Sequence, residues 1–397
     1  MRALLVFALL LACACSGGAH AGTSSEKAPK AELQVSAFTL DNGLEVELVS
    51  HPSCAGTAMS LRHSIGADHD PAHRSGMARV VASLLGDAVA GRLSTVRSST
   101  VRTSDGEVEE TLTRWAAEMR ALPTDELDAA KAEVRAALAA MRGGDPTETA
   151  IAFAAESVLP TLGDGWRGGV AEEIDAIDAG NVRARRPAYG PWGARLVIVG
   201  PIDPTRMRAL VTRTFGDVPA GDPPMARDPT HATVTGTIVM GDAPSVLALA
   251  VPAPSSDDAA YPAFAVLAAR LARTTDAPWT SRFDPVHEPG ILFVTAPLAM
   301  GEAPDGVAAS IRADLARAAA AELSDDELAD ARSRYGAALD PRSRDVARCA
   351  DDPRALAEVR AVRFGDPPVV TEDTLRAAAG RFSGRGVAAV AAGGAIR

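Results

Sequence analysis

Hydrophobic residues between Ser75 and Gly86 recur with the spacing of a helix that is apolar along one side. These residues are Met77, Val80, Val81, Leu84 and Leu85. We expect Ser75 to cap the start of this helix and Gly86 to end it. On a second side Arg79, Ala82 and Ser83 are spaced so that they lie close together and act as one group.

Alternation of apolar and polar residues predicts strands before and after this helix, and helical spacing recurs between the strands. The predicted strands are 35–40, 44–49, 59–65, 196–200, 233–240, 246–251, 291–296 and 387–392. The predicted helices are 108–122, a helix through Ala137 that Asp145-Pro146 closes, 174–183, 207–215, 261–273 and 307–321. Asp41-Asn42-Gly43 between the first two strands is a strong hairpin signal. The mixture predicts an α+β fold.

An internal repeat divides the chain into two halves. Asp125-Glu126-Leu127 returns as Asp326-Glu327-Leu328, and Val197–Gly200 returns as Val390–Gly393. The repeat predicts two tandem homologous domains, each a mainly antiparallel sheet covered by helices. We place them at 33–218 and 231–397, joined by the Pro- and Gly-rich linker 219–230.

The N-terminus reads as an export signal, because Met1-Arg2 precedes an apolar run that is too short to span a bilayer. Cys13 ends this run as in a bacterial lipobox, which predicts a signal segment 1–13, lipidation of Cys13 and a flexible tether 14–32. The alternative is signal-peptidase cleavage after Ala21. We therefore expect an outer-membrane lipoprotein facing the periplasm, or otherwise a soluble periplasmic protein.

The net charge and the cysteine content limit the kinds of partner and covalent bond to be expected. The 397 residues carry a formal net charge of -11, which argues against nucleic acid as a partner. Of the four cysteines, Cys13 and Cys15 lie in the export segment, whereas Cys54 and Cys349 lie in different halves. We treat Cys54 and Cys349 as separate thiols, although an oxidising compartment would permit a disulfide between them.

The run Leu40–Val46, together with Gly66-Ala67-Asp68 and Gly76-Met77-Ala78, resembles the opening of the pitrilysin/insulinase family of zinc metallopeptidases, the inverzincins. In that family an H-x-x-E-H helix supplies two zinc-binding histidines and a glutamate general base. The positions in register here are Arg79, Ala82 and Ser83, and Ala137 stands at the position of the distal glutamate ligand.

These replacements imply that the family's chemistry has been lost. Arginine has no lone pair to donate to a metal ion. We expect Ala137 to be an ordinary core residue, and we expect no catalytic residue, no metal ligand and no cofactor, although active relatives bind zinc.

Other family phrases extend the resemblance over nearly all of the chain after the tether. They include Tyr189-Gly190-Pro191, Val199-Gly200-Pro201 and Phe215–Pro219, which are structural in relatives. The family's substrate-binding Arg/Tyr loop is absent, since Ser281-Arg282-Phe283 leads almost directly to Gly290. Tyr335 falls on the repeat helix, where packing is the simpler role. The span from Leu85 to Thr124 is too short for the strand pair that lines the chamber of active relatives.

Asp68, His69, Asp70 and His73 form the densest cluster of ligand-type residues. Pro71 lies between the two histidines, so we expect a solvated turn rather than a metal site. The other histidines considered, His51, His63, His231 and His287, are isolated, and we expect them at the surface or at strand edges. No serine-nucleophile elbow or phosphate-binding glycine loop occurs.

The resemblance implies an insulinase-like homologue that is non-catalytic and acts as the partner subunit of a zinc endopeptidase or as an envelope scaffold. Its partners would be a catalytic family subunit or a peptide ligand, with a lipid anchor in the membrane. One alternative is an active zinc metalloendopeptidase with atypical ligands. Another is a free-standing envelope lipoprotein that binds peptides or proteins.

Overall fold

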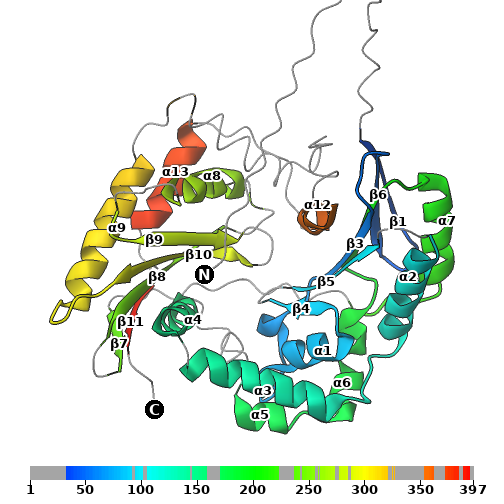
Figure 1. The fold of residues 1–397 in the computed structure, drawn as a ribbon, viewed down its shortest axis with the longest axis horizontal. Coiled ribbons are helices and arrows are strands. Elements are labelled where there is room, and N and C mark those ends of the chain that lie inside the picture. The colour runs from blue at the N-terminus through cyan, green and yellow to red at the C-terminus, as the bar shows by residue number, and fades with distance from the viewer. Residues whose placement is uncertain are drawn as a thin grey trace, which may run out of the picture. The chain divides into compact units, whose positions relative to one another are not determined.

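The computed structural model describes most of the chain between Leu33 and Gly393 (Figure 1). The described ranges are 33–91, 94–101, 105–143, 145–158, 170–222, 237–241, 244–254, 258, 260–272, 277–284, 288–320, 324, 326, 353–361, 372–383 and 388–393. All of them belong to one compact unit, Glu32–Arg397. Within these ranges no helix combines the length and the apolar character needed to cross a membrane.

The first sheet has six strands. Their spatial order is β1 (Gln34–Thr39), β2 (Glu45–Ser50), β6 (Ala194–Gly200), β3 (Thr57–His63), β5 (Thr95–Val101) and β4 (Ala88–Ala90). β2 and β6 are parallel, and every other neighbouring pair is antiparallel. Helices α2 (Asp105–Arg120) and α7 (Pro204–Phe215) cover one face, where they bury Met59, Leu61 and Ile198 (Figure 1).

The first hairpin is fixed to the end of α7. Gly43 adopts a φ of 88°, and a Cβ atom at this position would lie 3.3 Å from Trp192. A larger residue would therefore be strained and crowded here. The side-chain amide of Asn42 donates to the backbone oxygens of Phe215, at 2.7 Å, and Val218, at 3.0 Å. The predicted hairpin is confirmed, and the side chain of Asn42 in its turn joins the hairpin to the end of α7 and the segment that follows.

The second sheet has five strands. Their spatial order is β7 (Thr237–Met240), β11 (Ala388–Ala392), β8 (Val246–Pro252), β10 (Glu288–Pro297) and β9 (Thr280–Asp284). β7 and β11 are parallel and the other neighbours antiparallel. Apart from β1, the first sheet has the same sequence of neighbours and directions, in the same order along the chain. Each half of the chain therefore builds the same kind of mixed, mainly antiparallel sheet.

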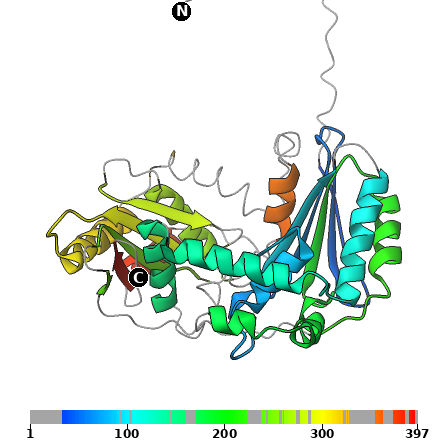
Figure 2. The same cartoon turned by 60° about the horizontal axis from the view of Figure 1, so that its bottom comes forward.

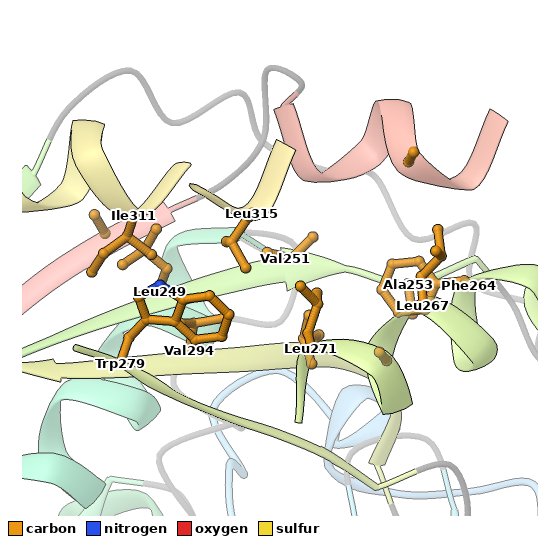
Figure 3. Packing of buried hydrophobic residues seen from close by; sticks show 14 of the residues in the cluster. Leu249, Val251, Ala253, Phe264, Leu267, Leu271, Trp279, Val294, Ile311 and Leu315 are labelled. Atoms are coloured by element: carbon orange, nitrogen blue, oxygen red, sulfur yellow. The ribbon is translucent and has the colours of Figure 1, made fainter. Parts of the chain in front are cut away.

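Helices α8 (Tyr261–Leu271), α9 (Pro304–Ala320) and α13 (Glu372–Ser383) cover one face of the second sheet. Figure 3 shows Leu249 and Val294 of the strands meeting Ile311 and Leu315 of α9, with Trp279 beside them. These side chains are almost completely buried, so this layer is a well-packed hydrophobic core.

Each half also contributes one helix to the sheet of the other half. Helix α4 (Pro146–Val158) packs Ala154 and Val158 against Phe293 and Val390 of the second sheet. Helix α12 (Pro353–Ala361) packs on the first sheet, on the face opposite α2 and α7 (Figure 2). Each sheet therefore has one face covered from its own half of the chain and one face that packs against a helix of the other half.

Several elements were missed by the sequence analysis. They are β4, β5, β9, α4, α12 and α13. β4 and β5 lie within the span from Leu85 to Thr124, ahead of α2, so the expectation that this span holds no strand pair is wrong. The sequence of β5, Thr-Val-Arg-Ser-Ser-Thr-Val, conceals a strand because its polar Arg97 is buried.

Two helix predictions also change. Asp145-Pro146 begins α4 instead of closing a helix pair, since the Asp145 carboxylate accepts the Thr147 N–H at 2.8 Å. The predicted helix 174–183 is divided into α5 (Ala171–Asp175) and α6 (Ala179–Ala184), because Asp178 caps α6 at 2.7 Å. In the second copy of the repeat Glu327, Leu328 and Tyr335 lie outside the described residues, whereas Val390–Gly393 lies within them.

Candidate functional site

Helix α1 (Met77–Leu85) lies between two glycines in the left-handed conformation. Gly76 has a φ of 92° and Gly86 a φ of 74°. The Gly86 N–H donates to the carbonyl oxygens of Ala82 and Ser83, which ends the helix as predicted. The start is different. Ser75, the predicted N-cap, donates its hydroxyl to Glu173 at 2.6 Å, and Gly76 occupies the N-cap position.

The apolar side of α1 packs against α3 (Leu127–Gly143). Met77, Val80, Val81 and Leu85 are buried with Ala130, Val134 and Leu138 of α3 in one hydrophobic cluster. This packing fixes α1 beside α3. It therefore brings together the two helices that carry Arg79, Ala82, Ser83 and Ala137, the positions that the resemblance aligns with the family's zinc motif.

Of the residues on the second side of α1, Arg79 and Ser83 are half-buried, whereas Ala82 is buried. Ser83 donates its hydroxyl to the exposed carboxylate of Glu133 on α3. Ala137 follows Glu133 by about one helical turn and is exposed, so the expectation that it is a core residue is wrong. It lies about 100° around the helix from Leu138, outside the buried stripe.

The side chains at this place do not fit a zinc ion. A guanidinium, two methyl groups and a hydroxyl already bonded to Glu133 offer no set of metal-binding lone pairs. What remains is a hydrogen-bonding surface with a fixed positive charge at Arg79.

Asp70 anchors the start of α1. Its carboxylate oxygens accept the Gly76 N–H at 2.7 Å and the Ala78 N–H at 2.8 Å. Burial raises the pKa of Asp70 to about 7, although both backbone bonds favour the ionised form. This residue has a structural role at the helix N-terminus.

The other members of the Asp68, His69, Asp70 and His73 cluster point to different partners. His69 accepts the Gly66 N–H at 3.2 Å through Nδ1, and its backbone oxygen accepts from Arg185 at 2.7 Å. The exposed His73 lies 3.9 Å from Glu173. Among the described residues no group of three or more His, Cys, Asp or Glu side chains is placed to hold a metal ion. Asp68 and His69 are 4% and 9% exposed, so the expectation of a solvated turn is wrong for them, and Asp70 is the member that holds the start of α1.

Two of the isolated histidines are buried, so the expectation of surface or edge positions is wrong for them. His51 and His63 are each 3% exposed. Burial, and then the positive charge of Arg97, lowers the pKa of His63 to about 3. Its ring lies 5.5 Å from the ring of Tyr189. His231 and His287 are outside the described residues.

A buried ion-pair network below α1 has no signature in the sequence. Arg97 on β5, which is 1% exposed, lies 2.7 Å from Asp87 and 2.6 Å from Glu118 of α2. It also lies over the ring of Trp115, 5.2 Å from its centroid. Although burial opposes it, the Arg97 guanidinium holds the pKa of Asp87 below its usual range. The network joins the end of α1 to β5 and α2.

Cys54 is disulfide-bonded, so the expectation that it is a separate thiol is wrong. It is 7% exposed and belongs to the cluster that α12 covers. Its partner lies outside the described residues.

Arg282 on β9 forms an ion pair at 3.0 Å with Glu148 of α4.

Comparison with known proteins identifies other proteins that have this fold. Residues 188–335 match the family described as the peptidase M16 inactive domain. A protease from Helicobacter pylori is 16% identical, with a TM-score of 0.68 over 90% of this chain and 99% of its own. The peptidase M16 inactive domain from Pseudomonas fluorescens is also 16% identical, with a TM-score of 0.68 over 91% and 98%.

A larger relative shows the same fold in part of its chain. The periplasmic protease PqqL from Escherichia coli is 15% identical, with a TM-score of 0.62 over 91% of this chain and 48% of its own. No curated protein matches the sequence. The chain is thus a pitrilysin-like, M16-type protein by fold, and it is degenerate at the family's zinc motif.

Proposed function

We propose that this chain is a non-catalytic insulinase-like subunit of the bacterial envelope, which acts beside a zinc peptidase of the same family. The observation that carries the proposal is the pairing of α1 with α3. The two helices that relatives use for zinc are packed together, yet Arg79, Ala82, Ser83 and Ala137 stand at the ligand and base positions.

Retention of the fold without the chemistry favours a binding or assembly role. The described core is closely packed in both sheets, so the scaffold has been kept intact while the motif changed. The half-buried Arg79 and the exposed Glu133 leave a polar surface at the place where relatives act. This surface could hold a peptide or face a catalytic partner.

The compartment in this proposal is the periplasmic side of the envelope. A periplasmic protease shares the fold, and a disulfide at Cys54 is the kind of bond that persists in an oxidising compartment. Lipidation of Cys13 would anchor the chain. Labelling with a radioactive fatty acid tests this point, because label should appear in the wild type and disappear in Cys13→Ser.

The test of function compares the chain alone with the chain beside a partner. The purified protein is assayed for zinc content and for chelator-sensitive cleavage of unstructured peptides. We expect neither. It is then co-expressed with an envelope family member from the same genome that has an intact H-x-x-E-H motif. We expect a stable complex whose cleavage rate or specificity differs from that of the catalytic chain alone.

Each other result has a definite meaning. Stoichiometric zinc and chelator-sensitive cleavage by the chain alone would establish an active peptidase with atypical ligands. Absence of a complex with every such family member, together with direct binding of peptides, would establish a free-standing binding protein. Either result overturns the proposal of a partner subunit.

A further inference from the structure

Strand β1 forms one edge of the first sheet, and β2 is its one neighbour among the described strands. Its six residues pair with β2 in a single unbroken register. The strand contains no charged residue and no proline. Proteins usually protect an exposed edge with a charge, a proline or a bulge, because its outward N–H and C=O groups can pair with another chain. β1 lacks all three kinds of protection.

The other edges of the two sheets differ from β1. β4 has only three residues and β7 only four. β9 contains Arg282 and Asp284, and the register of its pairing with β10 shifts between Glu288 and Leu292. Short length, charge and irregular pairing each hinder the addition of a further strand. Among the described edges, β1 is therefore the one that is long, regular and uncharged.

The hairpin determines which backbone groups of β1 point outward. The Leu40 N–H donates to the Leu44 oxygen at 2.9 Å, and this pair continues the register of β1 with β2. Because hydrogen-bonded and non-hydrogen-bonded pairs alternate along an antiparallel ladder, the even-numbered residues of β1 bond to β2. The N–H and C=O groups of Val35, Ala37 and Thr39 therefore point away from β2.

The side chains of Val35, Ala37 and Thr39 form an uncharged row on one face of the sheet. Phe38, which alternates with them, faces the other way, toward the core under α2 and α7, and its ring centre lies 4.5 Å from the guanidinium carbon of Arg208. Val35 is 48% exposed although it is apolar, and Ala37 and Thr39 are exposed as well. Outward backbone groups and small, uncharged side chains thus occur at the same three positions.

We propose that β1 pairs with β1 of a second copy of this chain, antiparallel and about a two-fold axis at Ala37. In this register Ala37 lies opposite Ala37 of the other copy, and Val35 lies opposite Thr39. The outward N–H and C=O groups of all three residues then find partners, since a hydrogen-bonded antiparallel pair exchanges both bonds. The two first sheets become one continuous sheet.

A second copy is the favoured occupant because the row is complementary to itself. The smallest side chain, that of Ala37, meets its own copy at the axis, and Val35 and Thr39 are β-branched residues that pack well across strands. No charged side chain of β1 is buried by the pairing. A contact made by one strand of six residues is small beside the roughly 1,200 Å² that stable interfaces bury at least, so the dimer should dissociate on dilution.

Sedimentation of the full exported chain, in a mild detergent and over a wide range of concentration, tests the association. We expect the wild type to change from monomer to dimer as the concentration rises. Ala37→Pro should weaken the dimer at least tenfold, because proline lacks the central outward N–H but leaves the bonds to β2 in place. The matched control Ala37→Ser keeps this N–H and should associate like the wild type.

Cysteine cross-linking under mild oxidation tests the register. Ala37→Cys should form an intermolecular disulfide, because opposed Cα atoms of a hydrogen-bonded pair are about 5.5 Å apart. Thr39→Cys alone should not, since its two copies would be offset by about 13 Å along the strands. A mixture of Thr39→Cys and Val35→Cys should cross-link. The wild type, with its native cysteines, sets the background.

Each other result overturns the proposal. A wild type that stays monomeric at every concentration excludes the pairing, even if foreign extended peptides bind at β1. A dimer that a folded Ala37→Pro variant leaves unchanged would use another surface. If Ala37→Pro does not fold, the cross-linking decides, and equal cross-linking of Thr39→Cys and Ala37→Cys would exclude a two-fold axis at Ala37.

Discussion

The hydroxyl of Ser83 on α1 donates a hydrogen bond to the carboxylate of Glu133 on α3. Ser83 stands where relatives carry the second histidine of their zinc motif. Glu133 precedes, by one turn, the alanine at the position of the distal glutamate ligand. The bond shows that α1 and α3 approach each other at the positions that the sequence resemblance aligns with the family's zinc motif. Because Glu133 is exposed, the pair contributes at most about 1 kcal/mol and its replacement should be tolerated.

Restoring the ligands should therefore restore metal binding. We expect the variant Arg79→His, Ala82→Glu, Ser83→His, Ala137→Glu to bind about one zinc ion per chain, because two histidines and a carboxylate complete a three-ligand site. The measurement is elemental analysis of the purified protein with a competing chelator titration. The matched control omits Ala137→Glu and should bind at least about tenfold more weakly, since one ligand is missing. A folded variant with the complete ligand set that binds no more zinc than the wild type would show that α1 and α3 do not retain the family geometry.

The stability of the protein should depend on His63 as the pH falls. Its pKa is about 3 in the folded state and 6.5 when exposed, so the unfolded chain binds the extra proton between these values. The contribution of His63 to the free energy of unfolding is complete above about pH 6.5, and it is lost as the pH falls through the folded pKa of about 3. The loss approaches roughly 3 to 5 kcal/mol. Urea unfolding of the wild type and His63→Gln at several pH values measures it, and the advantage of the wild type should shrink toward acid pH.

Asp70 should show the opposite dependence. Its pKa rises from 3.8 to about 7 on folding, so the folded chain binds the extra proton. Its contribution is complete below about pH 4 and is lost as the pH rises through about 7. The wild type should therefore be more stable than Asp70→Asn at acid pH, and this difference in the free energy of unfolding should shrink toward neutral pH. The two variants serve as controls for each other, and slopes of the same sign would contradict one of the two assignments.

Removing the charge of Glu47 should destabilise α12 in particular. Glu47 is buried between Arg195 and Arg360, so Glu47→Gln removes the carboxylate that pairs with the buried Arg360 of α12, whereas Arg195 keeps its second partner, Glu45, at 3.7 Å. The expected cost is about 3 to 5 kcal/mol. Urea unfolding measures the global cost, and amide hydrogen exchange should show protection lost from α12 before α13.

The control for this prediction lies on the same helix. Arg354 pairs with Glu358 at 2.8 Å, but the arginine is mostly exposed. Arg354→Ala should cost no more than about 1 kcal/mol. Equal effects of Glu47→Gln and Arg354→Ala would mean that the buried pair does not hold α12.

Local patterns in the sequence determined much of the secondary structure. The hairpin at Asn42-Gly43 and the stop at Gly86 were predictable because a left-handed backbone strongly favours glycine. The apolar spacing in α1 was predictable because one side of a helix must be buried. The absence of metal ligands at Arg79, Ala82, Ser83 and Ala137 was also readable, since it depends only on residue identity.

Tertiary structure alone decided the features that depend on residues distant in the chain. The exchange of α4 and α12 between the sheets leaves no periodic signal, because a helix has the same apolar stripe whichever sheet it covers. The burial of His63 and Arg97, the exposure of Ala137 and the disulfide at Cys54 depend on the neighbours that folding supplies. Spacing along the chain sets which side of an element is apolar, but packing determines what that side contacts.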